Sequence, residues 1–390
     1  MGVVAVLLSC LSFLPAPQAD AAEAKKIQEA IKKGVEFLRS QEGACLVASD
    51  VVGRKMCSRE LVLWTLINVG VSPKDPFYGK MFDDMMKDKL EATYPVALQA
   101  MCLEFIDRVQ LQKRIAQCAK FLMDNQGPGG YWSYGSPSIY IEDIEYDNGK
   151  QVAPKGPEFK LPDVPANPKV VKKITIKKDR DGEGNDASNS YVAALGLRAC
   201  SDAGIVFESR HLEQALKYWK ESCQGKGPAS GWAYDLRSQS TYPAVTASAV
   251  SCMLIYGNLL GVNLKKDPVV VGGAASLAKS WNGGTMFRAT NRGESDLFHE
   301  YGLYAVEISQ LFLGKDGAMA RDWYAEGAKK LLEEQKPDGS WDSSAKIVRI
   351  GGGQVGQAVY TSTPIWDTCF AVLFLTKGIK PLEFAPAKKK

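Results

Sequence analysis

The feature of this sequence that most constrains its fold is a pair of helix patterns that recurs about six times along the chain. The first stretch of each pair carries apolar residues at i, i+3, i+4 and i+7, which is the pattern of a half-buried helix. The second stretch is apolar almost all round and must therefore be buried. One-sided helices belong outside and all-round apolar helices inside, so the pattern predicts an all-α protein of two concentric layers. The predicted pairs are 24–40 with 58–69, 78–90 with 94–109, 111–125 with 189–203, 209–223 with 242–260, 268–280 with 296–313, and 319–335 with 361–376.

The first residues of the chain differ from the repeats. Residues 3–14 form an apolar run of signal-peptide length, too short to span a bilayer, although no Lys or Arg precedes it. The small residues Ala19-Asp20-Ala21 fit a cleavage site after Ala21. We therefore expect residues 1–21 to be a cleaved signal peptide and the protein to be exported to the periplasm, the cell envelope or the medium. We expect no transmembrane segment in the mature chain.

The rest of the chain is expected to form one domain, residues 22–380, followed by a basic tail at 381–390. One long irregular insert, 136–183, interrupts the third helix pair; it is rich in proline, acidic at first and then basic. Because long loops in compact domains are often functional, we expect an ordered flap over one end of the ring. Within the insert, the alternating run 170–178 is expected to be one arm of a hairpin.

Composition predicts no nucleic-acid partner and no cofactor. The chain has 48 basic and 44 acidic residues, and its net charge of +4 is not concentrated on one predicted face. No phosphate-binding glycine loop is present. Most of the nine cysteines lie in apolar helical stretches, where free Cys packs as a small hydrophobe. Cys45 and Cys57 are the one pair that suggests a disulfide.

Two loops share a spaced signature, and two others carry weaker versions of it. The well-formed copies are Gln126-x-x-x-Gly130-x-Trp132 and Gln335-x-x-x-Gly339-x-Trp341; the weaker ones are Gln224 with Gly231-Trp232, and Ser280-Trp281-Asn282-Gly283-Gly284. The signature is similar to the QW repeat of the prenyltransferase/squalene-cyclase superfamily, over roughly residues 25–378. This resemblance implies an (α/α)6 toroid with a central cavity lined by the inner helices. Gln is expected to close the outer helix, Gly to permit the turn, and Trp to stack against the next repeat.

The best-known active sites of this superfamily are missing from the sequence. Its alkene-protonating cyclases share an Asp-x-Asp-Asp motif, which this chain lacks. Its protein prenyltransferases bind zinc through an Asp-x-Cys pair and a His; here Asp367 occupies the position of that His, and no Asp-x-Cys begins the preceding inner helix. His299, Glu300 and Asp367 could still ligate zinc. The alternative is that His299 and Asp367 form a buried ion pair or hydrogen bond.

Polar and aromatic residues at the predicted starts of the inner helices are candidates for a site. Asp186, Asp296 and Asp367 are the carboxylates that could act as an acid. Five of the six residues from 185 to 190 are of capping type, and positive helix ends there could also meet an anionic group. The residues expected to line the cavity or bind a ligand are Asn189, Tyr191, Trp232, Tyr242, His299, Glu300, Tyr301, Tyr304, Tyr360 and Trp366, with Tyr134 and Tyr234 in the adjoining loops. Simple packing is the alternative for the aromatic residues.

Three functions remain open from the sequence. The first is a toroid that binds an apolar or isoprenoid-like ligand, or an envelope protein, in its cavity or on its rim. The second is a terpenoid cyclase or transferase with a divergent Asp acid. The third is a glycan hydrolase or lyase that uses a pair of carboxylates.

Overall fold

The computed structural model describes residues 21–46, 49–51, 54–56, 58–138, 141, 170, 172–237, 241–286, 299–314, 319, 322–342 and 364–377. Residues 1–20 of the expected signal peptide, the basic tail and most of the insert lie outside these ranges. The candidates Asp296 and Tyr360 and the cysteine Cys57 lie outside them as well.

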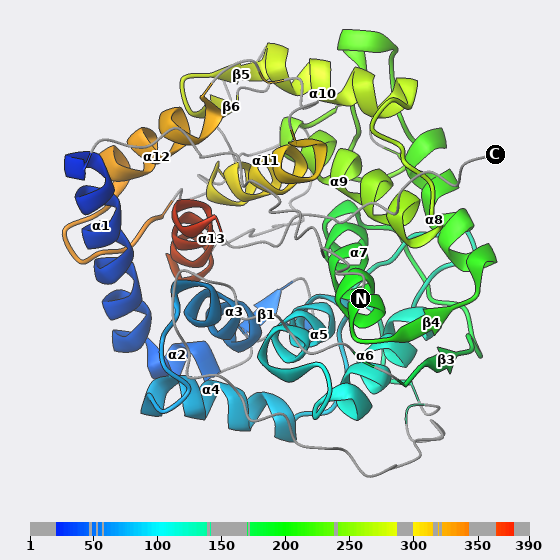
Figure 1. The fold of residues 1–390 in the computed structure, drawn as a ribbon, viewed down its shortest axis with the longest axis horizontal. Coiled ribbons are helices and arrows are strands. Elements are labelled where there is room, and N and C mark those ends of the chain that lie inside the picture. The colour runs from blue at the N-terminus through cyan, green and yellow to red at the C-terminus, as the bar shows by residue number, and fades with distance from the viewer. Residues whose placement is uncertain are drawn as a thin grey trace, which may run out of the picture.

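Six of the described helices form a closed inner ring (Figure 1). They are α3 (Arg59–Val69), α5 (Thr93–Asp107), α7 (Ala187–Asp202), α9 (Pro243–Leu259), α11 (His299–Leu313) and α13 (Pro364–Thr376). Each packs against the next, and α13 packs against α3. In α9 every residue from Val245 to Gly257 is buried, as expected for an inner helix that is apolar all round.

Six other helices surround this ring: α1 (Ala21–Ser40), α4 (Pro76–Lys87), α6 (Gln112–Asp124), α8 (Ser209–Glu221), α10 (Pro268–Ser280) and α12 (Trp323–Glu334). Helix α1 packs against α12 and α13, so the first and last repeats meet. The predicted all-α (α/α)6 toroid is confirmed, with helix bounds close to those predicted. No described helix is long and apolar enough to cross a membrane.

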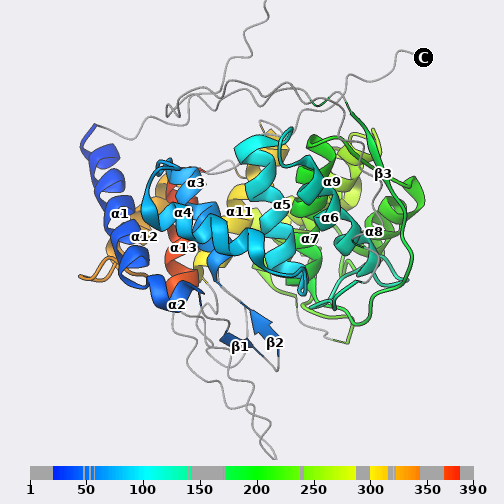
Figure 2. The same cartoon turned by 90° about the horizontal axis from the view of Figure 1, so that it is seen from below.

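Short elements fill the connections between the helices. Helix α2 (Glu42–Leu46) and the antiparallel hairpin of β1 (Ser49–Val51) and β2 (Arg54–Met56) lie between α1 and α3. Seen from the side, this hairpin projects from one face of the ring (Figure 2). A further antiparallel pair, β5 (Trp281–Asn282) and β6 (Thr285–Met286), follows α10.

In three loops, a tryptophan closes the outer helix that precedes it. Each indole Nε1–H donates to a carbonyl oxygen in the last turn of that helix, where helical partners run out. The donor and acceptor residues are Trp132 and Leu122 of α6 (2.7 Å), Trp232 and Trp219 of α8 (2.7 Å), and Trp341 and Leu331 of α12 (2.8 Å). The backbone N–H of each tryptophan donates to a hydroxyl near the start of the next inner helix: Ser190 (2.9 Å), Thr246 (3.3 Å) and Thr368 (3.1 Å). Each loop therefore holds the two helices of its own pair together.

The glutamines of the signature reach across to the following repeat. Gln126 Nε2 donates to the carbonyl oxygen of His211 in α8, and Gln335 Nε2 donates to that of Ala30 in α1, both at 2.9 Å. The second of these bonds joins the last loop to the first helix and so helps to close the outer layer.

As expected, tryptophan rings of the signature contact the next outer helix: Cβ atoms built on Gly273 of α10 and Gly34 of α1 would lie 3.0 Å and 3.1 Å from the rings of Trp232 and Trp341. The Gln side chains bind that next helix as well, and the Trp indole, rather than the Gln side chain, closes the preceding helix.

The run 170–178 does not form the expected hairpin arm. Strand β3 (Ile174–Ile176) pairs in parallel with β4 (Ile205–Phe207), which follows α7, and Ile174 lies opposite Ile205. An alternating pattern fixes which side chains of a strand are buried, but it does not identify the segment with which the strand pairs.

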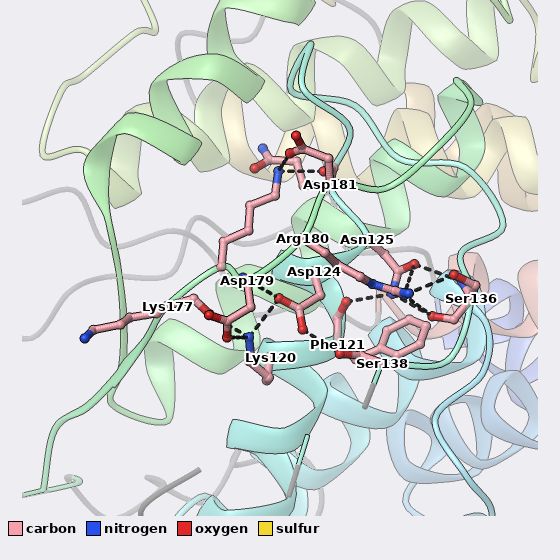
Figure 3. Close-up of polar contacts among 12 residues, drawn as sticks. Lys120, Phe121, Asp124, Asn125, Ser136, Ser138, Lys177, Asp179, Arg180 and Asp181 are labelled. Atoms are coloured by element: carbon pink, nitrogen blue, oxygen red, sulfur yellow. Dashed lines mark hydrogen bonds and ion pairs between the residues drawn. The ribbon is translucent and has the colours of Figure 1, made fainter. Parts of the chain in front are cut away.

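Beyond β3, the end of the insert is fastened to α6 by a buried polar cluster (Figure 3). Lys120 Nζ donates to Asp124 Oδ1 (2.8 Å), to the carbonyl oxygen of Lys177 (2.9 Å) and to the carboxylate of Asp179. Asp124 also accepts hydrogen bonds from Ser138 Oγ (2.5 Å) and from the backbone N–H of Asp179 (2.9 Å). The side chains of Lys120 and Asp124 are 5% and 0% exposed, so each depends on the other to offset the cost of its burial.

Gly130, like Gly339 in the other well-formed loop, is a signature position that tolerates no side chain. Its φ is +84°, and a Cβ atom there would lie 2.3 Å from the carbonyl group of Gln214 in α8. We expect Gly130→Ala to lower the free energy of unfolding by roughly 2 kcal/mol or more, because left-handed strain adds to a clash with backbone. The measurement is urea unfolding followed by circular dichroism.

The matched control for this prediction is Gly79→Ala. Gly79 lies within α4, and a Cβ atom there would meet nothing within 4 Å. Alanine is expected to raise the free energy of unfolding by about 0.5–1 kcal/mol at such a helix position. Equal unfolding midpoints for the two variants would contradict the assignment of Gly130.

Candidate functional site

The inner helices begin at one end of the ring, which we call the mouth. Backbone hydrogen bonds join neighbouring starts there. Thr93 N–H at the start of α5 donates to Tyr134 in the loop before α7 (2.8 Å), and Ala187 N–H at the start of α7 donates to Tyr234 in the loop before α9 (3.1 Å). The positive ends of the helix dipoles therefore gather at the mouth.

Asp186 is the predicted acid whose surroundings are best defined. It caps α7, because its Oδ1 accepts the N–H of Asn189 (2.8 Å), and its Oδ2 accepts the hydroxyl of Tyr234 (2.7 Å). Asp186 is 5% exposed. This burial raises its pKa, and the hydrogen bonds from Tyr234 and Asn189 offset part of the effect. A buried carboxyl group with a raised pKa at the entrance of a ring is typical of functional sites.

Two further polar groups of α7 are buried beside Asp186. The Oδ1 atom of Asn189 and the hydroxyl of Tyr191 have no hydrogen-bond partner among the described residues. A buried polar group without a partner costs about 1–3 kcal/mol, so native structures rarely keep one without a bound water, an ion or a function. Ser188 and Tyr234, which are half-buried, lie closer to solvent. We call Asp186, Ser188, Asn189, Tyr191 and Tyr234 the α7 polar cluster.

Aromatic side chains occupy the axis of the ring beneath the mouth. The ring centroid of Tyr191 lies 6.3 Å from that of Tyr301 in α11, and Phe370 of α13 lies 5.4 Å from Tyr301 and 5.5 Å from Tyr304. The hydroxyl of Tyr304 accepts a hydrogen bond from the indole of Trp64 in α3 (3.3 Å). Because α9 separates α7 from α11 in the ring, the contact between Tyr191 and Tyr301 crosses the interior.

Further aromatic groups complete the mouth. Tyr94 at the start of α5 stacks on Trp366 at the start of α13, with centroids 6.0 Å apart and planes 11° from parallel. The hydroxyl groups of Tyr301 and Ser248 in α9 lie 3.4 Å apart. Burial raises the pKa of Tyr94, Tyr191 and Tyr301, so these phenols remain neutral and able to donate hydrogen bonds. Tyr301 and Trp366 are half-buried and present aromatic surface at the mouth.

The three residues that could have ligated zinc, His299, Glu300 and Asp367, are not grouped as metal ligands in the structure. His299 Nε2 lies 3.7 Å from Glu334 in the outer helix α12. Burial lowers the pKa of His299, although Glu334 opposes this shift, so the imidazole is mainly neutral at pH 7. Glu300 and Asp367 are buried near the starts of α11 and α13. In the part of the chain that the structure describes, no three His, Cys, Asp or Glu side chains are grouped so that they could hold a metal ion.

Trp232, which we expected to line the cavity, lies instead between the layers. It is 1% exposed, and a Cβ atom built on Gly273 of α10 would lie 3.0 Å from its ring. Its indole closes α8, as Trp132 closes α6. Tyr242 is the residue before α9, and its N–H donates to the carbonyl oxygen of Trp232 (2.9 Å). The weak signature around Trp232 therefore predicted its position correctly, whereas the expectation that Trp232 lines the cavity was wrong.

Sequence reasoning missed four residues at or beneath the mouth: Trp64, Tyr94, Ser248 and Phe370. They lie in helices that are apolar all round, and such a pattern does not show which side faces the axis. A signal was available for Tyr94, which occupies the first turn of an inner helix, as Tyr301 does.

No family model matches the chain, and no curated protein is similar to it in sequence. Among solved structures, a possible member of the GH105 family from Salmonella enterica has a TM-score of 0.54 and 12% identity, covering 96% of this chain and 98% of that one. A possible GH105 member from Klebsiella pneumoniae has a TM-score of 0.53 and 12% identity, covering 97% and 98%. A type II terpene cyclase from Scytonema has a TM-score of 0.37 and 14% identity, covering 91% and 98%. At these identities the two GH105-like structures show the α/α toroid fold alone.

A second carboxyl group, Glu307 of α11, is buried away from the mouth. It is 0% exposed, and neither carboxylate oxygen has a hydrogen-bond partner among the described residues. Burial raises its pKa well above the usual range, and attraction to Lys377 lowers it by a smaller amount. The folded protein therefore favours the protonated form of Glu307.

We expect Glu307→Gln to stabilise the protein at neutral pH. A raised folded-state pKa means that the stability gained from protonation is complete below the unfolded pKa and is lost as the pH rises through the folded pKa. Glutamine cannot ionise, so the variant should gain about 1 kcal/mol or more at pH 8 relative to the parent, and less at pH 4. Thermal unfolding across this range measures the difference. Parallel pH curves for the parent and the variant would show that Glu307 is not buried as described.

Proposed function

We propose that this protein binds a hydroxyl-rich ligand, of the saccharide class, at the mouth of its inner ring. The α7 polar cluster carries this proposal. It combines a buried carboxyl group with two buried polar atoms that have no hydrogen-bond partner among the residues that the structure describes, and together these groups can accept and donate several hydrogen bonds. Tyr301 and Trp366 add half-buried aromatic faces beside it. Ligand hydroxyls would reach the deeper groups directly or through a bridging water.

An isoprenoid-like ligand is less well supported. Such a molecule needs a deep apolar cavity. The contacts among Tyr191, Tyr301, Phe370 and Tyr304 instead occupy the axis beneath the mouth. The proposal therefore keeps the ligand-binding toroid expected from the sequence and changes the chemistry of its ligand. Export, if the first residues act as a signal peptide, would expose the mouth to envelope or extracellular glycans.

A second candidate function is cleavage of a glycan with Asp186 as the acid. The observation that favours it is the burial that raises the pKa of Asp186, because an acid must hold its proton to protonate a leaving group. The fold is also one that the two GH105-like structures share. In this function Tyr234 would be a positioning residue that holds the Asp186 carboxyl group through its hydroxyl.

The binding proposal is tested with Tyr191→Phe. The substitution removes a hydroxyl that has no partner among the described residues, so stability should be unchanged or slightly higher. If the hydroxyl meets the ligand, affinity should fall about tenfold, the loss of about one hydrogen bond. The probes are neutral cello-oligosaccharides and acidic alginate oligosaccharides, with binding measured by titration calorimetry.

Tyr256→Phe is the matched control, because the hydroxyl of Tyr256 in α9 is also buried without a partner in the described chain. It should leave both stability and affinity unchanged. Equal affinity of the parent and Tyr191→Phe for a bound probe would place the ligand away from the α7 polar cluster. Failure of the parent protein to bind either series would reject the saccharide class as represented by these probes.

Asp186→Asn separates binding from catalysis. The Oδ1 atom of asparagine can still accept the capping N–H of Asn189, and its Nδ2 can donate to the hydroxyl oxygen of Tyr234, which reverses that hydrogen bond, so the fold should be kept. If Asp186 is the acid, release of new reducing ends from a bound oligosaccharide should fall by about 10²-fold or more, while affinity changes little. If the parent protein binds the probes and releases no product, the second candidate function is rejected for these glycans.

A further inference from the structure

The two well-formed signature loops of this chain align without gaps, and the positions at which their residues differ are informative. Residues 126–132 read Gln-Gly-Pro-Gly-Gly-Tyr-Trp, and residues 335–341 read Gln-Lys-Pro-Asp-Gly-Ser-Trp. The shared Gln, Gly and Trp make the same structural contacts in both loops. The second loop makes them with Ser340 where the first has Tyr131. Tyr131 is therefore not needed to build the loop.

Tyr131 nevertheless occupies a specific position that depends on its neighbours. Its ring lies across the backbone of Gly127 and Gly129, since Cβ atoms built on these glycines would lie 2.6 Å and 2.3 Å from ring carbons. Neither glycine has a positive φ, so each is required for space rather than for backbone conformation. The matched loop has Lys336 and Asp338 at these two positions.

The Tyr131 ring forms one wall of a surface pocket. The ring of Tyr218 in α8 lies edge-to-face with it, with centroids 5.5 Å apart, and Asn185 Nδ2 donates to the Tyr218 hydroxyl (2.9 Å). Leu236, which is 57% exposed, lines the pocket as well. The polar lining residues are Gln214, Lys217, Glu221 and Ser222. The hydroxyl of Ser222 is buried and has no partner among the described residues.

This pocket adjoins the mouth through shared elements. Asn185, which holds Tyr218, precedes Asp186, and the carbonyl oxygen of its side chain accepts the N–H of Leu236 (3.2 Å). Leu236 lies two residues after Tyr234, which holds Asp186 at the mouth. The segment 233–237 is thus a common wall, with the α7 polar cluster on one side and the pocket on the other.

We infer that the pocket lined by Tyr131, Tyr218 and Leu236 is an outer subsite that binds one sugar unit of an extended glycan whose other end lies at the mouth. This inference rests on the proposed function. Aromatic faces pack against the apolar face of a sugar ring, while amide, ammonium, carboxylate and hydroxyl groups at the rim pair with its hydroxyls. A proline-rich peptide would use the aromatic rings but would leave most of these polar groups without a role.

The test variant is Tyr131→Ser, which takes its residue from the matched loop. It keeps Gln126, Gly130 and Trp132, so the protein should unfold at nearly the same temperature. Against the same neutral and acidic oligosaccharides, affinity for chains of about six units should fall about tenfold, and affinity for chains of one or two units should be unchanged. Leu236→Ser, at the opposite wall, should act in the same direction. Tyr191→Phe should weaken the binding of short and long chains alike.

Each outcome separates the subsite from the mouth. Equal affinity of the parent and Tyr131→Ser for long chains overturns the outer subsite while leaving the proposed function intact. An equal loss at every chain length also overturns it, because Tyr131 would then act on the mouth. Binding of a proline-rich peptide that Tyr131→Ser abolishes, without an effect on oligosaccharides, would assign the pocket to a protein partner. If the parent binds no oligosaccharide, the proposed function and the subsite fail together.

Discussion

The hydrogen bond from a tryptophan indole to the last turn of the preceding outer helix is the interaction on which the rest of the ring depends. It fixes the loop, and the fixed loop then presents a backbone N–H to the next inner helix. In two repeats a glutamine side chain also reaches the next outer helix. A single such bond contributes only about 1 kcal/mol net, but an indole buried without a partner costs more. The loop therefore sets the geometry of three helices at once.

This geometry explains why the candidate site lies where it does. The signature loops all precede inner helices, so their contacts stiffen the mouth. Thr93 and Ala187, at the starts of two inner helices, are each hydrogen-bonded to the loop of the following repeat. A carboxyl group such as Asp186 is thus buried on a rigid frame. Burial raises the pKa of Asp186, and the hydrogen bonds from Tyr234 and Asn189 offset part of this effect.

The sequence was sufficient to predict the helix pairs and the two layers, because both depend on a repeated local pattern. The closed toroid was what the resemblance of the signature loops to the QW repeat implied. The sequence was also sufficient to place Asp186 and Tyr191 at the start of an inner helix. It could not predict that Tyr191 meets Tyr301 across the ring, because that contact depends on how far each inner helix is rotated about its own axis. The pairing of β3 with β4 and the outward direction of His299 were missed for a related reason. Both depend on contacts between segments far apart in the sequence, which a local pattern does not record.

Closure of the ring also has consequences for how the chain folds and for the order in which its repeats can be connected. The bond from Gln335 to Ala30 joins residues 305 positions apart, and α1 lies against α12 and α13. An open solenoid protects its two ends with polar capping repeats, whereas here the first repeat caps the last. Neither end of the array can be completed until the other is present, so the last step of folding is coupled to the first. Because the first and last repeats are neighbours in the ring, the chain could begin at a different repeat without changing the fold. A circular permutant opened at a short turn between an inner and an outer helix would retain almost every contact of the ring.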